Sequence, residues 1–372
     1  MIVAGRLVLD DRIVSGRISV AAGLIESVEE ETASAEAGGP FVLPGFVDVH
    51  VHGFGGHSAM GSAADLDGMA RALLARGVTS FLPTAVTAPL DELRGFAERV
   101  RDWMPRARRD GTEPLGFNIE GPFISAERRG AHDPRHIVAP ADVDRARLEP
   151  LLDGLRLITV APETAGAPEL IAWLRGRGVA VSIGHSAATL TQARAGYAAG
   201  ATSTTHLFNA MSGLDHRSPG LAAAALADDE AYVELIADGH HVDRALWPIV
   251  MRTKPRDRLL LVSDAVAVAG TEAERGEIGG LPVEVADGRL VLAGSQTLAG
   301  SLIALDAALR AMVAAGAPLA DAAAAAAANP LAMLGITDRG RLAARQRADI
   351  VELDDRLNVR RVMRAGEWLV SR

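Results

Sequence analysis

The middle of the chain alternates short apolar runs with longer amphipathic stretches. The apolar runs have the length of strands that are buried on both faces. They cover residues 46–51, 78–83, 115–119, 155–161, 179–183, 202–207, 232–237 and 259–262. Most of the stretches between them predict helices, over residues 63–76, 90–104, 167–178, 187–200 and 243–253. Eight strands, each followed by a crossover, indicate α/β architecture with a (β/α)8 TIM barrel; an open doubly wound sheet is the alternative.

The two ends of the chain show a different pattern, of short strands separated by Gly and Asp. Such strands are expected at residues 6–9, 12–14, 17–20 and 24–28, and again at 349–353, 359–365 and 368–370. We therefore expect a small β-sandwich domain built from residues 1–43 and 336–372, beside a barrel domain at 44–335. Within the barrel domain, residues 276–297 predict an inserted β-hairpin. A helix is expected at 301–315, and an Ala-rich helix at 322–328 that Asn329–Pro330 ends.

Composition excludes several classes of function. The net charge is −9, and no basic patch is interleaved with aromatic residues, so nucleic acid is not an expected partner. The Arg128–Arg129 cluster is expected to be a solvated face or a loop contact. The absence of Cys excludes disulfides, iron–sulfur clusters, thiolate zinc sites and a Cys nucleophile. The N-terminal residues do not resemble a signal peptide, and the tract 322–328 is too short to cross a bilayer, so we expect a cytoplasmic protein without a membrane partner.

Histidines and carboxylates gather at the ends of the predicted strands. The first strand ends on His50 and His52, which point to the same face because strand side chains alternate. Later strands end on Glu120, His185, His206, His240, His241 and Asp264. The carboxyl ends of barrel strands meet at one mouth, where buried charges need partners. One or two divalent cations are therefore expected, and this ligand set suits zinc, iron(II), cobalt(II) or manganese(II).

Other hydrolytic chemistries fit the sequence less well. Residues 184–186 begin like a nucleophile elbow, but Ala188 stands where the final Gly is required. Lys254 is the only lysine, and it precedes the last barrel strand, at the end opposite the mouth. Schiff-base catalysis and a carboxylated lysine that bridges two metals are therefore not expected. Glu120 is the remaining candidate for a bridging ligand.

Several segments resemble the N-acetylglucosamine-6-phosphate deacetylases of the amidohydrolase superfamily. The segments that carry the resemblance are 44–53, Glu120-Gly121-Pro122-Phe123, Gly184-His185-Ser186, His206-Leu207-Phe208-Asn209-Ala210-Met211, 238–243 and Ser263-Asp264-Ala265. The resemblance covers nearly the whole chain. The segments 120–123 and 206–211 are specific to this family, whereas His-x-His marks only the superfamily.

The resemblance implies a metal-dependent hydrolase and a set of metal ligands. Glu120, His185 and His206 would hold the principal metal, and Asp264 would be a ligand and the catalytic acid/base. Some members lack the two histidines of the first strand and hold one metal. This chain keeps His50 and His52, so a second metal is expected there. Zinc is the first choice for the metal, with iron(II), cobalt(II) and manganese(II) as alternatives.

The resemblance also implies the substrate contacts. His132 would act on the substrate carbonyl and contact the sugar, and Asn209 and Ala210 would bind the phosphate through their main chain. Arg217 and His241 match phosphate contacts that the family takes from a neighbouring subunit, which implies a homodimer. The loop that lines the sugar would run from Thr297 to Ser301 and include Leu298, Ala299 and Gly300. His240 receives no role.

The implied reaction is hydrolysis of the acetamide of N-acetyl-D-glucosamine 6-phosphate to D-glucosamine 6-phosphate and acetate. One alternative is a deacetylase of another N-acyl amino sugar, such as N-acetylgalactosamine 6-phosphate. The other is a non-catalytic scaffold with the same fold. Such scaffolds usually lose ligands, whereas here every expected ligand is present.

Overall fold

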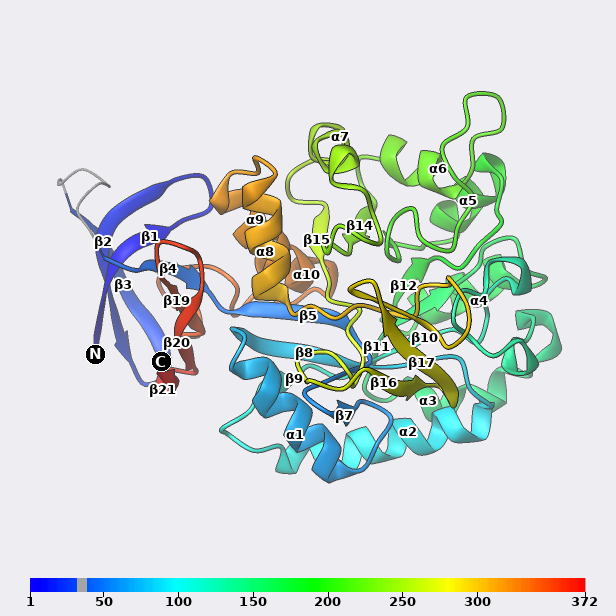
Figure 1. The fold of residues 1–372 in the computed structure, drawn as a ribbon, viewed down its shortest axis with the longest axis horizontal. Helices are drawn as coiled ribbons and strands as arrows, with labels where there is room; N and C mark the ends of the chain where they lie inside the picture. Colours follow the sequence, from blue (N-terminus) through cyan, green and yellow to red (C-terminus); the bar gives the residue numbers. More distant parts are fainter. Residues whose placement is uncertain (32–38, 372) are drawn as a thin grey trace.

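A parallel barrel forms the main body of the protein, whose computed structural model describes residues 1–31 and 39–371 (Figure 1). Its strands pair in chain order: β5 (Phe46–Val51), β8 (Val78–Ala85), β10 (Phe117–Glu120), β11 (Leu155–Val160), β12 (Ala180–Ile183), β13 (Ser203–Thr204), β14 (Tyr232–Leu235) and β15 (Leu259–Leu261). The short β9 (Glu113–Pro114) also pairs with β8. The Asp264 amide donates to the His50 carbonyl at 2.9 Å, which joins the chain after β15 to β5. The barrel is confirmed over the open sheet.

Helices surround the barrel strands (Figure 1). The α-helices are α1 (Ala63–Leu74), α2 (Leu90–Trp103), α3 (Glu149–Leu152), α4 (Ala167–Arg175), α5 (Leu190–Ala198), α6 (Leu221–Ala227), α7 (Trp247–Thr253), α8 (Leu305–Ala314), α9 (Leu319–Ala326) and α10 (Ala328–Met333). Short 3₁₀ turns are η1 (Met104–Arg106), η2 (Ala126–Arg128), η3 (Pro134–His136), η4 (Pro140–Asp142), η5 (Arg145–Arg147) and η6 (Arg244–Leu246). No helix of the described residues is long and apolar enough to cross a membrane.

The Ala-rich stretch differs from its prediction at its end. Helix α9 stops at Ala326, but α10 begins at Ala328 and contains Asn329–Pro330. A proline in the first turn of a helix loses no hydrogen bond, because the first amides have no partner within the helix. The Asn329 side chain donates to the Leu259 carbonyl at 2.8 Å, which fixes this turn against β15. The pair Asn329–Pro330 therefore starts a second helix.

Strands from both termini form one further sheet, to the left of the barrel in Figure 1. Its order is β21 (Glu367–Ser371), β20 (Val359–Arg364), β19 (Ile350–Leu353), β4 (Phe41–Pro44), β1 (Ile2–Val8), β2 (Ile13–Ala21) and β3 (Leu24–Glu30). The runs expected at 12–14 and 17–20 belong to the single strand β2. Leu7, Ile18, Val42, Ile350 and Met363 lie in its buried core. The domain bounds 1–43 with 336–372, and 44–335, stay a prediction.

A small antiparallel sheet follows β15. The expected hairpin corresponds to β17 (Leu281–Ala286) and β18 (Arg289–Leu292), and β16 (Arg275–Ile278) pairs with β17. Strand β16 was not predicted, because its first three residues are exposed and show no alternation. Ile278 packs with Val86 and Val266, which follow barrel strands β8 and β15. The sheet therefore lies beside the barrel mouth. The pair β6 (Gly53–Phe54) and β7 (His57–Ser58) follows β5.

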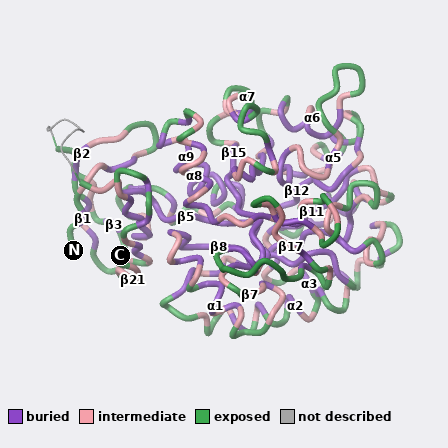
Figure 2. The backbone as a smooth tube through the Cα atoms, in the orientation of Figure 1, coloured by how far each residue is buried: buried purple, intermediate pink, exposed green. Residues whose placement is uncertain are grey.

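Burial follows the strand pattern (Figure 2). Every residue of β5, β8, β10 and β12 is buried, so these strands face side chains on both sides. This double burial explains why the sequence shows continuous apolar runs there.

An ion-pair cluster joins the terminal sheet to the barrel. Glu113 in β9 contacts Arg347, and its Oε1 lies 3.3 Å from Arg339 Nη1. Arg347 also contacts Asp349, which precedes β19. Burial opposes ionisation of Glu113, but the two arginines outweigh this effect and lower its pKa. The carboxylate therefore contributes to stability.

We expect Glu113→Ala to lower the free energy of unfolding by about 1–2 kcal/mol, a charged hydrogen-bond loss reduced by partial exposure. Because the pKa of Glu113 is lowered in the folded state, its contribution is present above the unfolded pKa and lost as pH falls through the folded pKa. Denaturant unfolding at neutral and acidic pH measures both effects. Glu30→Ala, which removes an exposed partner of Arg12, is the control and should change stability little. Equal effects of the two substitutions would contradict the prediction.

Candidate active site

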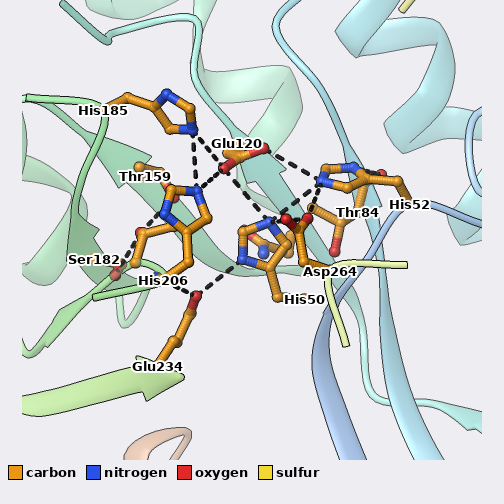
Figure 3. A network of polar contacts seen from close by, with 12 residues as sticks. His50, His52, Thr84, Glu120, Thr159, Ser182, His185, His206, Glu234 and Asp264 are labelled. Atoms are coloured by element: carbon orange, nitrogen blue, oxygen red, sulfur yellow. Dashed lines mark hydrogen bonds and ion pairs between the residues drawn. The ribbon is translucent and has the colours of Figure 1, made fainter. Parts of the chain in front are cut away.

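The carboxylate of Glu120, at the end of β10, lies at the centre of a group of histidines in the barrel mouth (Figure 3). Its Oε1 is 2.8 Å from His206 Nε2 and 2.9 Å from His185 Nε2. Its Oε2 is 3.3 Å from His52 Nε2 and 3.2 Å from His132 Nε2. The two oxygens of one buried carboxylate thus face different histidines. This is the geometry that a bridging ligand needs.

The ligand atoms form two groups. Glu120, His185 and His206 make one group, and His50, His52 and Asp264 make the other. We call them the Glu120 cluster and the Asp264 cluster. Within each group the ligand atoms lie within 4.8 Å of one another, and all six residues are buried. The structure therefore brings together every residue predicted to bind metal.

The outer nitrogens of three imidazoles show which way their lone pairs point. His52 Nδ1 lies 3.1 Å from the Thr84 carbonyl, and His185 Nδ1 lies 2.9 Å from the Arg128 carbonyl. His50 Nδ1 lies 2.9 Å from Glu234 Oε2. Because these oxygens accept hydrogen bonds, each Nδ1 is the donor, and the Nε2 lone pair of the neutral ring faces the cluster.

The facing nitrogens are close enough to need a cation between them. His185 and His206 have their Nε2 atoms 3.1 Å apart, and those of His50 and His52 are 3.3 Å apart. Lone pairs at this separation repel unless a proton or a metal lies between them. Imidazole and carboxylate ligands suit first-row divalent metals. The residues present therefore fit the expected metal.

The charges of the site shift its pKa values strongly. Burial opposes protonation of His52, but hydrogen bonds with Asp264 and Glu120 outweigh it and raise the pKa of His52 to about 9. Burial opposes ionisation of Asp264, yet His52 and His50 lower its pKa to about 2. Burial lowers the pKa of His132 to about 4. The carboxylates are thus ionised, and protons compete with a metal for the ligand nitrogens.

Three residues of the two clusters have unusual backbone angles. His185 has φ 45°, His206 has φ 25° and Asp264 has φ 50°. Residues other than Gly rarely adopt this left-handed region, and they do so where the surrounding structure enforces it. Each follows the end of a barrel strand, so the strained turn directs its side chain into the mouth.

A cavity of about 420 Å³ opens over the two clusters. The metal-site residues in its wall are His52, Glu120, His185, His206 and Asp264, and the predicted substrate-binding residues there are His132, Asn209, Ala210, His241, Leu298 and Gly300. Thr87 donates its amide to His132 Nδ1 at 3.2 Å, so neutral His132 carries its proton on Nε2. This Nε2–H group lies at the cavity wall, and Glu120 Oε2 accepts it at 3.2 Å.

Two predicted substrate residues do not line this cavity. Ala299 is fully buried, and its amide donates to the Leu290 carbonyl at 3.1 Å. Arg217 lies in an exposed loop, and its guanidinium pairs with no described residue. Asp215 instead accepts the main-chain amides of Arg217 and Ser218. Asp215 therefore stabilises the turn and leaves the Arg217 guanidinium unpaired among the described residues.

His241 and His240 differ in their surroundings. His241 Nδ1 lies 2.7 Å from Asp238 Oδ2, which fixes its ring at the cavity wall. His240 does not line this cavity, is exposed, and donates its amide to Asp238 Oδ1 at 2.8 Å.

Sequence reasoning missed several residues of the site. Arg128 lines the cavity and its carbonyl orients His185, although its cluster was expected to be a solvated face or loop contact. Glu234 contacts His50. A signal for Glu234 was available, because it is the single charged residue in the apolar run 232–237. Gln296, which precedes the predicted sugar-lining loop, also lines the cavity.

Comparison with known proteins places this chain in a family. The Amidohydrolase family matches residues 41–369. An N-acetylgalactosamine-6-phosphate deacetylase of Escherichia coli O157:H7 is 36% identical, over 96% of this chain and 95% of its own. An N-acetylglucosamine-6-phosphate deacetylase of Bos taurus is 37% identical, over 90% and 85%.

Solved structures agree with the relatives. The N-acetylglucosamine-6-phosphate deacetylase of Thermotoga maritima superimposes with a TM-score of 0.93 at 32% identity, over 100% of both chains. A mutant of the Mycobacterium smegmatis enzyme, in complex with N-acetyl-D-glucosamine-6-phosphate, gives 0.93 at 34% identity, over 100% and 99%. The resemblance inferred from the motifs is confirmed, and the chain belongs to the amidohydrolase family.

Proposed function

We propose that this protein hydrolyses the acetamide of N-acetyl-D-glucosamine 6-phosphate, releasing D-glucosamine 6-phosphate and acetate. The observation that carries the proposal is the pair of adjoining ligand clusters, beneath a cavity lined by six of the eight expected substrate residues. The Mycobacterium smegmatis relative, solved with this sugar phosphate bound, supports the choice of substrate. We place the reaction in the cytoplasm, where charged sugar phosphates are retained.

We assign the principal metal to the Glu120 cluster and a second metal to the Asp264 cluster. Zinc is the first choice, and iron(II), cobalt(II) or manganese(II) are alternatives with the same ligand preference. When bound, such a cation lowers the pKa of water and polarises an amide carbonyl.

Asp264 and His132 then perform the proton transfer and the charge stabilisation. The carboxylate of Asp264 lines the cavity, so it can accept a proton from the attacking water. The water oxygen forms a bond to the carbonyl carbon, the C–N bond breaks, and Asp264 returns the proton to the departing amine. The Nε2–H group of His132, which lines the cavity, would donate a hydrogen bond to the developing oxyanion and so stabilise it.

The loops around the cavity bind the rest of the substrate. Asn209 and Ala210 would offer main-chain contacts to the phosphate, and Leu298 and Gly300 would line the sugar. Arg217 would reach the phosphate of a neighbouring subunit in a homodimer, together with His241. Two observations support this assembly: Arg217 is exposed, and Leu214 in the same loop is an apolar side chain with 65% of its area exposed.

The galactosamine epimer is the second candidate substrate. The Escherichia coli relative that is named for this epimer matches 96% of the chain at 36% identity, close to the values for the glucosamine enzymes. Side-by-side kcat/KM measurements on the two N-acetylated sugar phosphates decide between them. No turnover of either would favour the non-catalytic scaffold.

Asp264→Asn should keep the fold and most of the bound metal, because the amide oxygen remains a ligand. We expect kcat to fall about 10²–10⁴-fold, the usual contribution of a general acid/base. Metal analysis and the melting temperature are measured on the same sample. Near-normal turnover would exclude the proposed proton transfer.

The two metal clusters should respond differently to ligand loss. His185→Ala or His206→Ala should empty the principal site and abolish activity, because each removes one of three ligands. His50→Ala combined with His52→Ala should remove the second metal alone. Elemental analysis of the purified variants measures both effects. If the double variant holds no metal while His206→Ala keeps its full complement, the assignment of the two sites is reversed.

Arg217→Ala should raise KM for the phosphorylated sugar tenfold or more, equivalent to about 1.5–3 kcal/mol for a charged hydrogen bond. Activity on unphosphorylated N-acetylglucosamine should hardly change. Arg194→Ala, at an exposed position of α5, is the matched control and should behave like the parent protein. Equal losses on both sugars would show that Arg217 supports its loop and does not bind the phosphate.

A further inference from the structure

We propose that Glu234 is a positioning residue that sets the metal affinity of the Asp264 cluster through the ring of His50. Glu234 lies in β14 and is fully buried. Its Oε2 accepts a hydrogen bond from His50 Nδ1 at 2.9 Å and another from the His206 amide at 3.1 Å (Figure 3). His50 belongs to the Asp264 cluster and His206 to the Glu120 cluster. A single carboxylate oxygen therefore contacts one residue of each cluster. The proposal rests on the metal centre proposed above.

The ring of His50 needs this partner because its backbone is already held elsewhere. Asp48 Oδ1 accepts the His50 amide at 3.3 Å, and the Asp264 amide donates to the His50 carbonyl at 2.9 Å. These bonds place the Cα atom but leave the ring free to rotate about its side-chain bonds. The hydrogen bond to Glu234 fixes both the orientation and the tautomer, so that Nε2 points at the cluster.

The other ligand imidazoles of the two clusters do not depend on a side chain in this way. His52 and His185 donate Nδ1–H to the main-chain carbonyls of Thr84 and Arg128. His206 Nδ1 has no hydrogen-bond partner among the described residues. A carboxylate acceptor makes the imidazole a stronger donor to a metal than a carbonyl does. Glu234 should therefore strengthen His50 as a ligand.

The packing of the barrel does not explain this carboxylate. Glu234 Oε1 is buried without a hydrogen-bond partner in the described part of the chain, which costs stability. An apolar residue would suit an interior strand better. The charge is instead explained by the imidazole that it contacts.

Glu234→Gln and Glu234→Leu test the proposal by metal binding, without substrate. The metal-free proteins are titrated with Zn²⁺ in competition with a chelator, and bound metal is counted by elemental analysis. We expect the first Zn²⁺ to bind as in the parent protein. The second should bind about 10–100-fold more weakly, with Gln at the low end, because its oxygen can still accept the hydrogen bond. The melting temperature of the metal-free proteins checks the fold. If Glu234→Leu does not fold, the result for Glu234→Gln decides the test.

Glu163→Gln is the matched control. Its carboxylate accepts hydrogen bonds from the Ser186 hydroxyl at 2.7 Å and the Ala187 amide at 2.6 Å, beside a ligand-bearing turn but without contact to a ligand ring. This variant should bind both metals as the parent does. The proposal is overturned if both Glu234 variants bind the second Zn²⁺ as tightly as the parent protein does, or if both sites weaken equally. It is also overturned if the parent protein binds a single Zn²⁺. Because no substrate is used, these outcomes are independent of the deacetylase assay.

Discussion

The structure depends on the burial of one carboxylate among imidazoles. Glu120 is 3% exposed, and a carboxylate withdrawn from water is costly unless positive charge surrounds it. Histidine can supply that charge as a proton or give its lone pair to a metal. The site is therefore built so that imidazoles converge on Glu120, and acceptors fix the outer nitrogens of His50, His52 and His185. The left-handed turns at His185 and His206 belong to the same arrangement.

This arrangement places one cluster at the seam of the barrel. His50 lies at the end of β5, and Asp264 follows β15, so the hydrogen bond between their main chains closes the barrel within the Asp264 cluster. The Glu120 cluster instead draws on β10 and the turns after β12 and β13. Barrel closure and the Asp264 cluster therefore use the same residues, while the Glu120 cluster lies away from the seam, at the ends of β10, β12 and β13. The oxygens of Glu120 connect the two.

Most of the barrel could be predicted because parallel strands buried on both faces leave continuous apolar runs in the sequence. Ligand types at the ends of those runs could be placed for the same reason. Strand β16 could not, since exposed Arg275 and Glu277 do not alternate with apolar residues. The acceptors behind His52 and His185 are main-chain carbonyls, which any residue type could provide. The contact between Glu234 and His50 depends on the register of strands that are distant in the sequence, so the residue types alone do not reveal it.

The chemistry and the substrate recognition rest on different parts of this fold. The ligand clusters lie at strand ends whose positions are fixed by packing on both faces, so a change there disturbs the barrel. Asn209, Leu298 and Arg217 lie in loops, where a change of backbone path costs less. On the proposed assignment, a preference between epimers that differ at one sugar hydroxyl would arise in these loops. Relatives named for each epimer match this chain at 36% and 37% identity, so overall identity does not separate the two substrates.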